Sequence, residues 1–242
     1  MVDQMKATAS HLYSRYGVKT PNIERLGSMG VRYENATTPH PLCVPARTAM
    51  WTARNPHKTG SLSNKFPLSQ GMDHAAKWWK EAGYELALIG KNHCFLDQQD
   101  RDFFDVWCEI EHFGLRDRFP DPSSPRGMDW VEEENLVTEA HAVRNNMPPS
   151  DGGSVGHAVT DFEHKHYSSG LLARQADAYI RQQQNPFVLW LSFPDPHVPY
   201  EVPLEYYERV KAQNIELPPM GPPPGEESPE RNRVLSKMMR WP

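Results

Sequence analysis

The stretch EAGYELALIGKNH, residues 81–93, decides the fold class of this chain. Met72–Ala82 carries apolar residues at helical spacing and is followed by glycine, a typical residue at the end of a helix. The mostly apolar run Tyr84–Ile89 then predicts a buried parallel strand. Lys91 and His93 follow where that strand ends, and alternation along a strand end predicts that both side chains share one face.

A second helix and strand lie nearer the carboxyl end. Tyr167–Gln184 predicts an amphipathic helix, and Phe187–Phe193 predicts the second buried strand. The apolar face of that helix carries Leu171, Leu172, Ala176 and Ile180. Helices that alternate with short apolar strands predict an α/β fold whose sheet is covered on both faces.

Three shorter elements complete the pattern. Pro21–Met29 predicts a helix with Thr20 as its cap, because serine and threonine caps followed by proline are typical of helix starts. Val31–Glu34 predicts a short strand, and Ala46–Thr52 a further helix.

Polar residues follow three separated apolar runs or the remnant of one, at Asp3, at residues 90–93 and at residues 194–197. Sites in open α/β sheets lie beyond the carboxyl ends of the strands. We therefore expect these three stretches to converge on one rim, together with Cys43.

The stretch CVPAR, residues 43–47, places a cysteine two residues before a proline and four before an arginine. Pro45 suits the first turn of a helix because its ring fixes φ. Arg47, one turn further on, can stabilise a nucleophile and a nearby anion through charge-assisted hydrogen bonds. The alternative for Arg47 is an exposed helix cation.

This C-x-P-x-R stretch resembles the signature of the sulfatase family. Val44 departs from the usual small residue, and Ala53 stands where the signature has glycine. Four flanking blocks resemble family motifs in family order: TPNIERL at 20–26, VRYENA at 31–36, residues 81–93, and PFVLWLSFPDPHVPY at 186–200.

The resemblance implies an alkaline phosphatase-like α/β/α sandwich with a central, mostly parallel mixed sheet. It also implies hydrolysis of an organic sulfate ester. Cys43 would be converted by a formylglycine-generating enzyme to formylglycine, whose hydrate is the nucleophile. Asp3 and Cys43, as formylglycine, would bind a divalent metal with assistance from Gln4. Ca²⁺ is expected, with Mg²⁺ or Mn²⁺ as alternatives, because hard cations prefer oxygen ligands.

The resemblance also assigns the remaining site residues. Arg47 would support the hydrate and the metal site. Lys91 would hold sulfate oxygens, and His93 would assist proton transfer at the formylglycine hydroxyl. His197 would contact the substrate and aid leaving-group protonation, while Asn64 resembles a substrate-contacting asparagine of some relatives.

Family members usually open with a fuller apolar strand and continue further, to an Asp-His or Asp-Asn pair that completes the metal site. No D-H-G or D-N-G triplet occurs here. We therefore expect residues 1–242 to be a single, incomplete N-terminal catalytic domain, truncated at both ends. Residues 114–160 are expected to form a loop-rich insertion, and residues 218–242 a flexible tail.

Composition limits the partners. The 242 residues carry a formal net charge of −5 and no Lys/Arg run, which argues against a nucleic-acid surface. No apolar run approaches a membrane span, and the lack of a signal segment favours the cytoplasm while localisation stays open. The expected partners are a small-molecule or carbohydrate sulfate ester and the maturing enzyme; the oligomeric state stays open.

Two alternatives remain. The same scaffold could hydrolyse phosphate or phosphonate monoesters or diesters, although the Lys91–His93 pair favours sulfate. The chain could also be a catalytically incomplete fragment, because the second metal-binding pair is absent from the sequence.

Overall fold

The computed structural model describes residues 1–14, 16–110, 126–130, 157–198, 200–213, 215–216, 227–230 and 233–234. The chain forms two compact units. The first comprises Met1–Met5, Tyr33–Asn146 and Phe162–His197; the second comprises Lys6–Arg32, Met147–Asp161 and Val198–Pro242. Most of the expected insertion at 114–160 and of the expected tail at 218–242 lies outside the described residues, so both stay predictions.

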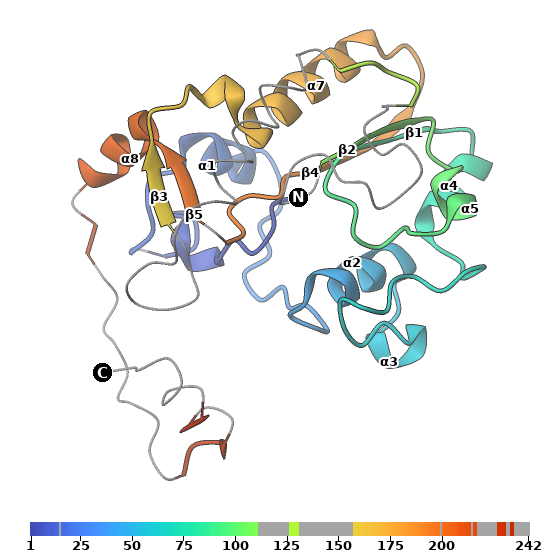
Figure 1. Ribbon diagram of the computed structural model, residues 1–242, viewed down its shortest axis with the longest axis horizontal. Coiled ribbons are helices and arrows are strands. Elements are labelled where there is room, and N and C mark those ends of the chain that lie inside the picture. Colours follow the sequence, from blue (N-terminus) through green and yellow to red (C-terminus); the bar gives the residue numbers. More distant parts are fainter. Residues whose placement is uncertain are drawn as a thin grey trace. The chain divides into compact units, whose positions relative to one another are not determined.

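The first unit is built on a three-stranded parallel sheet with the order β2-β1-β4 (Figure 1). Its strands are β1 (Glu85–Gly90), β2 (Val106–Glu109) and β4 (Phe187–Ser192). The first residues of the chain extend beside β4, where Val2 forms a parallel bridge with Phe193. The Phe193 N–H donates to the Met1 carbonyl at 3.0 Å, so Asp3 follows a short strand-like segment.

Both faces of this sheet are covered, as Figure 1 shows for α7 on one side and α2 and α4 on the other. The helices are α2 (Cys43–Thr52), α3 (Pro56–Thr59), α4 (Ala75–Glu81), α5 (Gln98–Arg101) and α7 (Ser168–Gln182), preceded by the 3₁₀ turn η2 (His164–His166). The expected α/β/α layering is therefore confirmed in this unit.

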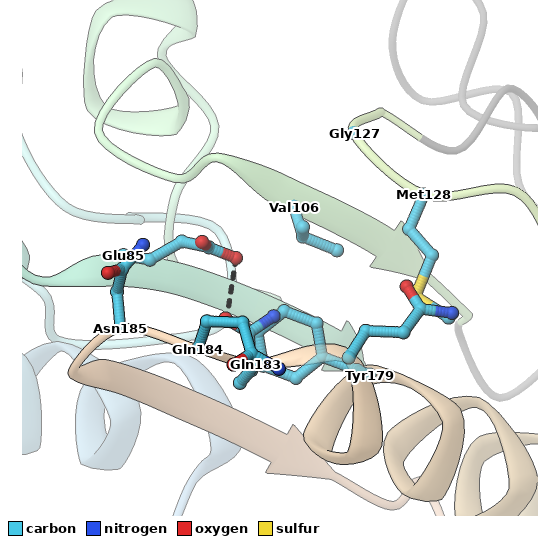
Figure 2. Close-up of a pocket in the computed structure, with 9 residues that line it drawn as sticks. Glu85, Val106, Gly127, Met128, Tyr179, Gln183, Gln184 and Asn185 are labelled. Carbon is cyan, nitrogen blue, oxygen red and sulfur yellow. Dashed lines mark hydrogen bonds between the residues drawn. The ribbon is translucent and has the colours of Figure 1, made fainter.

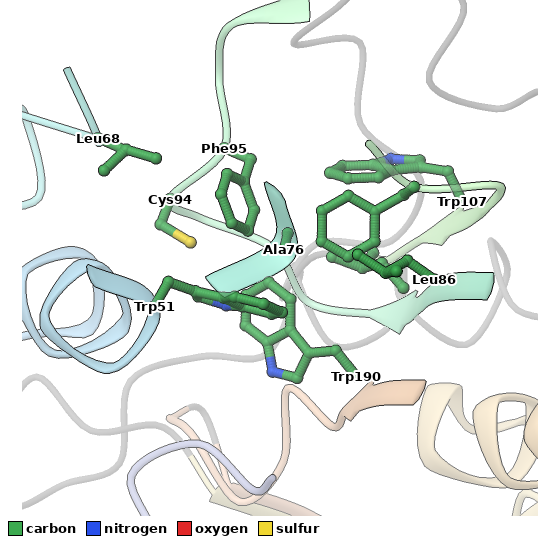
Figure 3. Close-up of a cluster of buried hydrophobic side chains, with 10 residues drawn as sticks. Trp51, Leu68, Ala76, Leu86, Cys94, Phe95, Trp107 and Trp190 are labelled. Atoms are coloured by element: carbon green, nitrogen blue, oxygen red, sulfur yellow. The ribbon is translucent and has the colours of Figure 1, made fainter. Parts of the chain in front are cut away.

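Alternate residues of β1 point into two separate cores. Leu86 and Leu88 pack with Trp51 of α2 and Trp190 of β4, and Figure 3 shows several of these rings together. Trp51 meets Trp190 edge-on with ring centroids 5.0 Å apart. Each large apolar side chain buried in this way contributes about 1.5–3 kcal/mol to folding.

The other face of the sheet packs on α7. Ala87 and Ile89 of β1 contact Leu171, Leu172 and other buried residues of this helix. The predicted helix and both predicted strands are thus confirmed, and β1 is buried as expected, whereas in β4 only Trp190 and Ser192 are buried. One detail is wrong: Ile180 is 49% exposed and does not belong to the buried face.

One predicted strand and two predicted helix boundaries differ from the structure. The strand predicted at Val31–Glu34 is wrong, because these residues form no strand and Val31 is 79% exposed. A strand needs a neighbouring ladder, which local sequence does not supply. The predicted helix Met72–Ala82 begins only at Ala75, since His74 is extended (φ −148°, ψ 161°). The signature helix begins earlier than predicted, at Cys43.

The second unit contains η1 (Ala7–Ala9), α1 (Pro21–Ser28), a parallel pair of strands and α8 (Leu204–Lys211). The strands are β3 (His157–Thr160) and β5 (Tyr200–Pro203). The predicted first helix is confirmed as α1. Its cap differs in detail, because the Thr20 N–H donates to Glu24 Oε1 at 2.9 Å while the Thr20 side chain makes no cap bond.

Among the helices that the structure describes, none has the length and apolar character needed to cross a membrane.

Candidate active site

Side chains from four separate segments meet at the carboxyl end of the sheet. Asp3 follows the strand-like start of the chain, Lys91 follows β1, His197 follows β4, and Cys43 begins α2. Donor atoms of Asp3, Cys43 and His197 all lie within 4.8 Å of one another. The predicted convergence on one rim is confirmed for these residues.

Cys43 is half-buried at the first position of α2, after Leu42 in an extended conformation. Its Sγ lies 3.7 Å and 3.8 Å from the two carboxylate oxygens of Asp3, and 3.9 Å from Nζ of Lys91. The amino end of a helix carries partial positive charge, which stabilises an anion placed there. A nucleophile at this position therefore lies between a helix end, a carboxylate and an ammonium group.

Asn64 acts on the helix that carries Cys43. Its Oδ1 accepts a hydrogen bond from the Val44 N–H at 3.1 Å. Because Leu42 provides no side-chain cap, Asn64 satisfies one of the free N–H groups at the start of α2. The structure thus gives Asn64 a contact with the nucleophile's own helix.

Lys91 is completely buried, and its ammonium group contacts Oδ2 of Asp3. Burial lowers the pKa of Lys91, and the neighbouring Asp3 carboxylate opposes that shift. Gly90 allows the end of β1 to lie close to the backbone of β4, because a Cβ there would lie 2.0 Å from the Ser192 carbonyl oxygen. The Lys91 N–H donates to that same carbonyl at 2.7 Å.

Arg47 is 1% exposed, so the alternative of an exposed helix cation is wrong. Its Nη1 donates to the Lys91 carbonyl and to Ser192 Oγ, each at 2.8 Å. Nη2 lies 3.9 Å from Oδ2 of Asp3, and the guanidinium lies 5.6 Å from the Trp190 ring centroid. Arg47 therefore ties α2 to the ends of β1 and β4.

His93 and Gln4 both adopt left-handed backbone conformations, with φ of 65° and 61°. His93 is half-buried and Gln4 is exposed. Strand alternation does not relate His93 to Lys91 as predicted, because β1 ends at Gly90 and the chain turns at His93. Among the described histidines, His197 and not His93 belongs to the group with Asp3 and Cys43.

Asn92 holds the loop between Lys91 and the core, a role that the sequence analysis missed. Its Oδ1 accepts from the N–H groups of Cys94 and Phe95 at 3.2 Å and 2.9 Å, while Nδ2 donates to the Phe95 carbonyl at 2.8 Å. The available signal was an asparagine between Lys91 and His93 directly after an apolar run, because asparagine side chains often bond to nearby backbone groups in turns.

A cavity of about 270 Å³ opens at the opposite, amino-terminal end of the sheet (Figure 2). Glu85 and Val106 begin their strands there, and Tyr179 OH donates to Glu85 Oε1 at 3.1 Å. None of the predicted site residues lines this cavity. The chemistry-bearing side chains gather at the other end of the sheet.

The donor set fits a divalent metal differently before and after conversion of Cys43. The carboxylate oxygens of Asp3 suit a hard cation, whereas the sulfur of an unconverted Cys43 suits a softer metal. Formylglycine would replace sulfur by oxygen at the same place. Within the described residues, the group therefore suits the implied hard cation only in its converted form.

The family model called Sulfatase matches residues 1–218. The chain belongs to the sulfatase family. Among the curated members, the uncharacterized sulfatase YidJ of Escherichia coli (strain K12) is 25% identical over 247 residues, covering 100% of this chain and 46% of that protein.

Solved structures agree on the fold. The phosphonate monoester hydrolase of Agrobacterium radiobacter has a TM-score of 0.61 at 18% identity, covering 89% of this chain and 44% of that one. A protein solved with its substrate D-glucosamine-2-N,6-O-disulfate has a TM-score of 0.56 at 21% identity, covering 81% of this chain and 33% of that one. These neighbours support the alkaline phosphatase-like fold expected from the sequence. In each comparison, this chain spans less than half of the length of its relative.

Proposed function

We propose that the protein hydrolyses organic sulfate esters with a formylglycine nucleophile derived from Cys43. The observation that carries the proposal is the position of Cys43. It begins α2 with its Sγ 3.7 Å from Asp3 Oδ1 and 3.9 Å from Lys91 Nζ, in a chain of the sulfatase family.

Each residue would contribute a distinct part of the reaction. When present, the formylglycine hydrate would supply the attacking oxygen and release sulfate as the aldehyde re-forms, and the metal would polarise a sulfate oxygen. Lys91 would hold sulfate oxygens, and Arg47 would fix the rim through Ser192 and the Lys91 carbonyl. His197 would protonate the bridging oxygen of the leaving alcohol.

Three further residues would contribute around this group. His93 would take part in proton transfer at the hydrate hydroxyl, since it follows Lys91 by two residues and is half-buried. Asn64 would position α2 through Val44 and lie at the edge of the substrate site. Gln4 would assist metal binding from its place next to Asp3.

The metal would be Ca²⁺, with Mg²⁺ or Mn²⁺ as alternatives, held by Asp3 and the converted Cys43. The chemistry of the donor set supports this choice, because a carboxylate and a hydrate offer only oxygen atoms. Lys91 and Arg47 beside Asp3 add positive charge, so additional acidic ligands would favour binding of the ion.

The substrate would be a small-molecule or carbohydrate sulfate ester. One relative of the same fold was solved with a sulfated glucosamine, which supports a carbohydrate. Maturation would require a formylglycine-generating enzyme as a partner, since the nucleophile is made from a cysteine.

Hydrolysis of phosphonate or phosphate esters is the second candidate. It is favoured by the fold match to a phosphonate monoester hydrolase. The ratio of kcat/KM for an aryl sulfate to that for an aryl phosphonate, measured on one preparation, separates the two. A ratio above one supports the sulfatase proposal, and a ratio below one supports the phosphonate alternative.

Mass spectrometry of the Cys43 peptide tests the proposal. The full protein is expressed in a host with the maturing enzyme, and the aldehyde is trapped with a hydrazide. Conversion together with Ca²⁺-dependent aryl sulfate hydrolysis is expected, and a Cys43→Ala variant should show neither. Turnover of sulfate esters by protein whose Cys43 is entirely thiol would contradict the proposed nucleophile.

A further inference from the structure

Asp195 connects three parts of the first unit: the start of α7, the backbone of Asp3 and the turn that carries His197. Its Oδ2 accepts hydrogen bonds from Ser169 Oγ at 2.5 Å and from Ser168 Oγ at 3.5 Å. Its main-chain carbonyl accepts from the Asp3 N–H at 3.3 Å. Asp195 is therefore fixed both through its side chain and through its backbone.

The carboxylate of Asp195 lies at the amino end of a 15-residue helix. Ser168 and Ser169 are the first two residues of α7, and Tyr167, the cap residue, makes no side-chain cap bond. Helix starts stabilise negative charge through their exposed N–H groups and the helix dipole. The serine hydroxyls thus hold a carboxylate where the helix itself favours one.

A short turn links the fixed Asp195 to His197. The His197 N–H donates to the Pro194 carbonyl at 3.2 Å, which closes the turn, and one residue separates Asp195 from His197. His197 in turn brings a ring nitrogen within 4.8 Å of donor atoms of Asp3 and Cys43. The position of the imidazole therefore depends on a turn whose anchor is the Asp195 carboxylate.

We propose that Asp195 is a positioning residue that holds the His197 imidazole against Asp3 and Cys43 through the start of α7. Asp195 contacts the two serines and the Asp3 backbone, and it would act on the reaction through His197. A misplacement of about 1 Å at a reacting group can lower a rate by about 100-fold. The kinetic part of the test rests on the proposed function, and the spectroscopic part does not.

The kinetic test is a double-mutant cycle with Asp195→Ala and His197→Ala in the full protein. We expect Asp195→Ala to lower kcat/KM for an aryl sulfate by about 10- to 100-fold when His197 is present. In the His197→Ala background, the same substitution should change kcat/KM by less than about 2-fold, because the group that it positions is gone. Equal losses in both backgrounds would overturn the proposal.

Matched variants separate positioning from general destabilisation. Asp195→Asn keeps an oxygen that accepts from Ser169, so it should retain most of the activity, whereas Ser169→Ala should lose activity in the same direction as Asp195→Ala. Asp177→Asn removes another acidic group of α7, exposed and paired with Arg181, and should leave kcat/KM unchanged. Ser169→Ala also serves as the milder test if Asp195→Ala folds poorly. Unchanged activity in Ser169→Ala would count against the proposal.

An NMR measurement of the His197 ring tests the same inference without turnover. The ring signals are assigned by comparison with His197→Ala, and their shift and line width are followed in each variant. We expect a clear change in Asp195→Ala and Ser169→Ala, and none in Asp177→Asn. If the unsubstituted protein hydrolyses no sulfate ester, the proposed function fails, and the NMR measurement alone then tests whether Asp195 positions His197. His197 signals that are identical in the unsubstituted protein and in Asp195→Ala would overturn the positioning role.

Discussion

The ammonium group of Lys91 contacts a carboxylate oxygen of Asp3, 88 residues earlier in the chain, and both side chains are buried. Arg47 Nη2 lies 3.9 Å from the same oxygen. Two buried cations thus share one carboxylate at the carboxyl end of the sheet. The stability of this rim and the proposed reaction there consequently depend on the same three side chains, those of Asp3, Arg47 and Lys91.

Removing Asp3 should destabilise the fold strongly. Asp3→Ala leaves Lys91 and Arg47 without their shared carboxylate, and breaking a buried pair from one side costs about 3–5 kcal/mol. The double variant Asp3→Ala/Lys91→Met should be less destabilised than Asp3→Ala, because one unpaired charge is gone. Urea unfolding measures both. Asp73→Ala, which removes an exposed pair with Lys77, is the control and should change stability by less than about 1 kcal/mol.

Arg47→Lys should behave as a disruptive substitution. Lysine cannot reproduce the two hydrogen bonds of Nη1 to the Lys91 carbonyl and Ser192 Oγ together with the approach of Nη2 to Asp3. We expect a loss of about 1.5–3 kcal/mol in the free energy of unfolding, the range for a hydrogen bond to a charged group. Arg54→Lys, at an exposed position, should be neutral within about 0.5 kcal/mol. Equal effects of the two substitutions would contradict the buried role of Arg47.

Asn92→Ala should loosen the loop that follows β1. The substitution removes an acceptor from the N–H groups of Cys94 and Phe95, which stay buried, at a cost of about 1–3 kcal/mol. Hydrogen exchange at these two amides measures the effect directly. Asn92→Asp keeps the acceptor oxygen and should protect both amides better than Asn92→Ala. Equal protection in the two variants would show that another group holds the loop.

The three thiols should differ in reactivity when Cys43 is unconverted. Burial raises the pKa of Cys108 to about 12, and burial also raises the pKa of Cys94 far above its usual value. Cys43 is half-buried. Iodoacetamide at pH 8.5 should therefore label Cys43 in the folded protein and all three cysteines in urea, as peptide mass spectrometry would show. Rapid labelling of Cys108 in the folded protein would contradict its burial.

The raised pKa of Cys108 also predicts a pH dependence of stability. The unfolded thiol ionises near 9.0, whereas the folded thiol stays protonated up to about 12. Between these values the folded state binds more protons, so this contribution is complete below pH 9 and is lost as the pH rises towards 12. The free energy of unfolding should fall less steeply over this range in Cys108→Ala than in the unsubstituted protein. Parallel pH profiles would contradict the prediction.

Local sequence determined the elements with strong periodicity. The continuous apolar run of β1 was sufficient to predict a strand buried on both faces. The amphipathic pattern of α7, with apolar residues at helical spacing, was sufficient to predict a helix buried along one face. The signature around Cys43 indicated the family only together with the four flanking blocks, because a five-residue motif recurs by chance. Val31–Glu34 shows the limit, because its strand-like composition found no neighbouring ladder.

Only the tertiary structure decided how the rim is assembled. The burial of Arg47 and Lys91, the cap that Asn64 supplies to α2 and the anchor of Asp195 on α7 all join residues far apart in sequence. Periodicity reports which face of an element is apolar, but it carries no information on which distant polar groups will meet. The sequence by itself therefore indicated the family, two of the three strands of the sheet and the candidate site residues, whereas β2 was not predicted. Tertiary packing decided which of those residues share charges, because that depends on how parallel strands bring their carboxyl ends together.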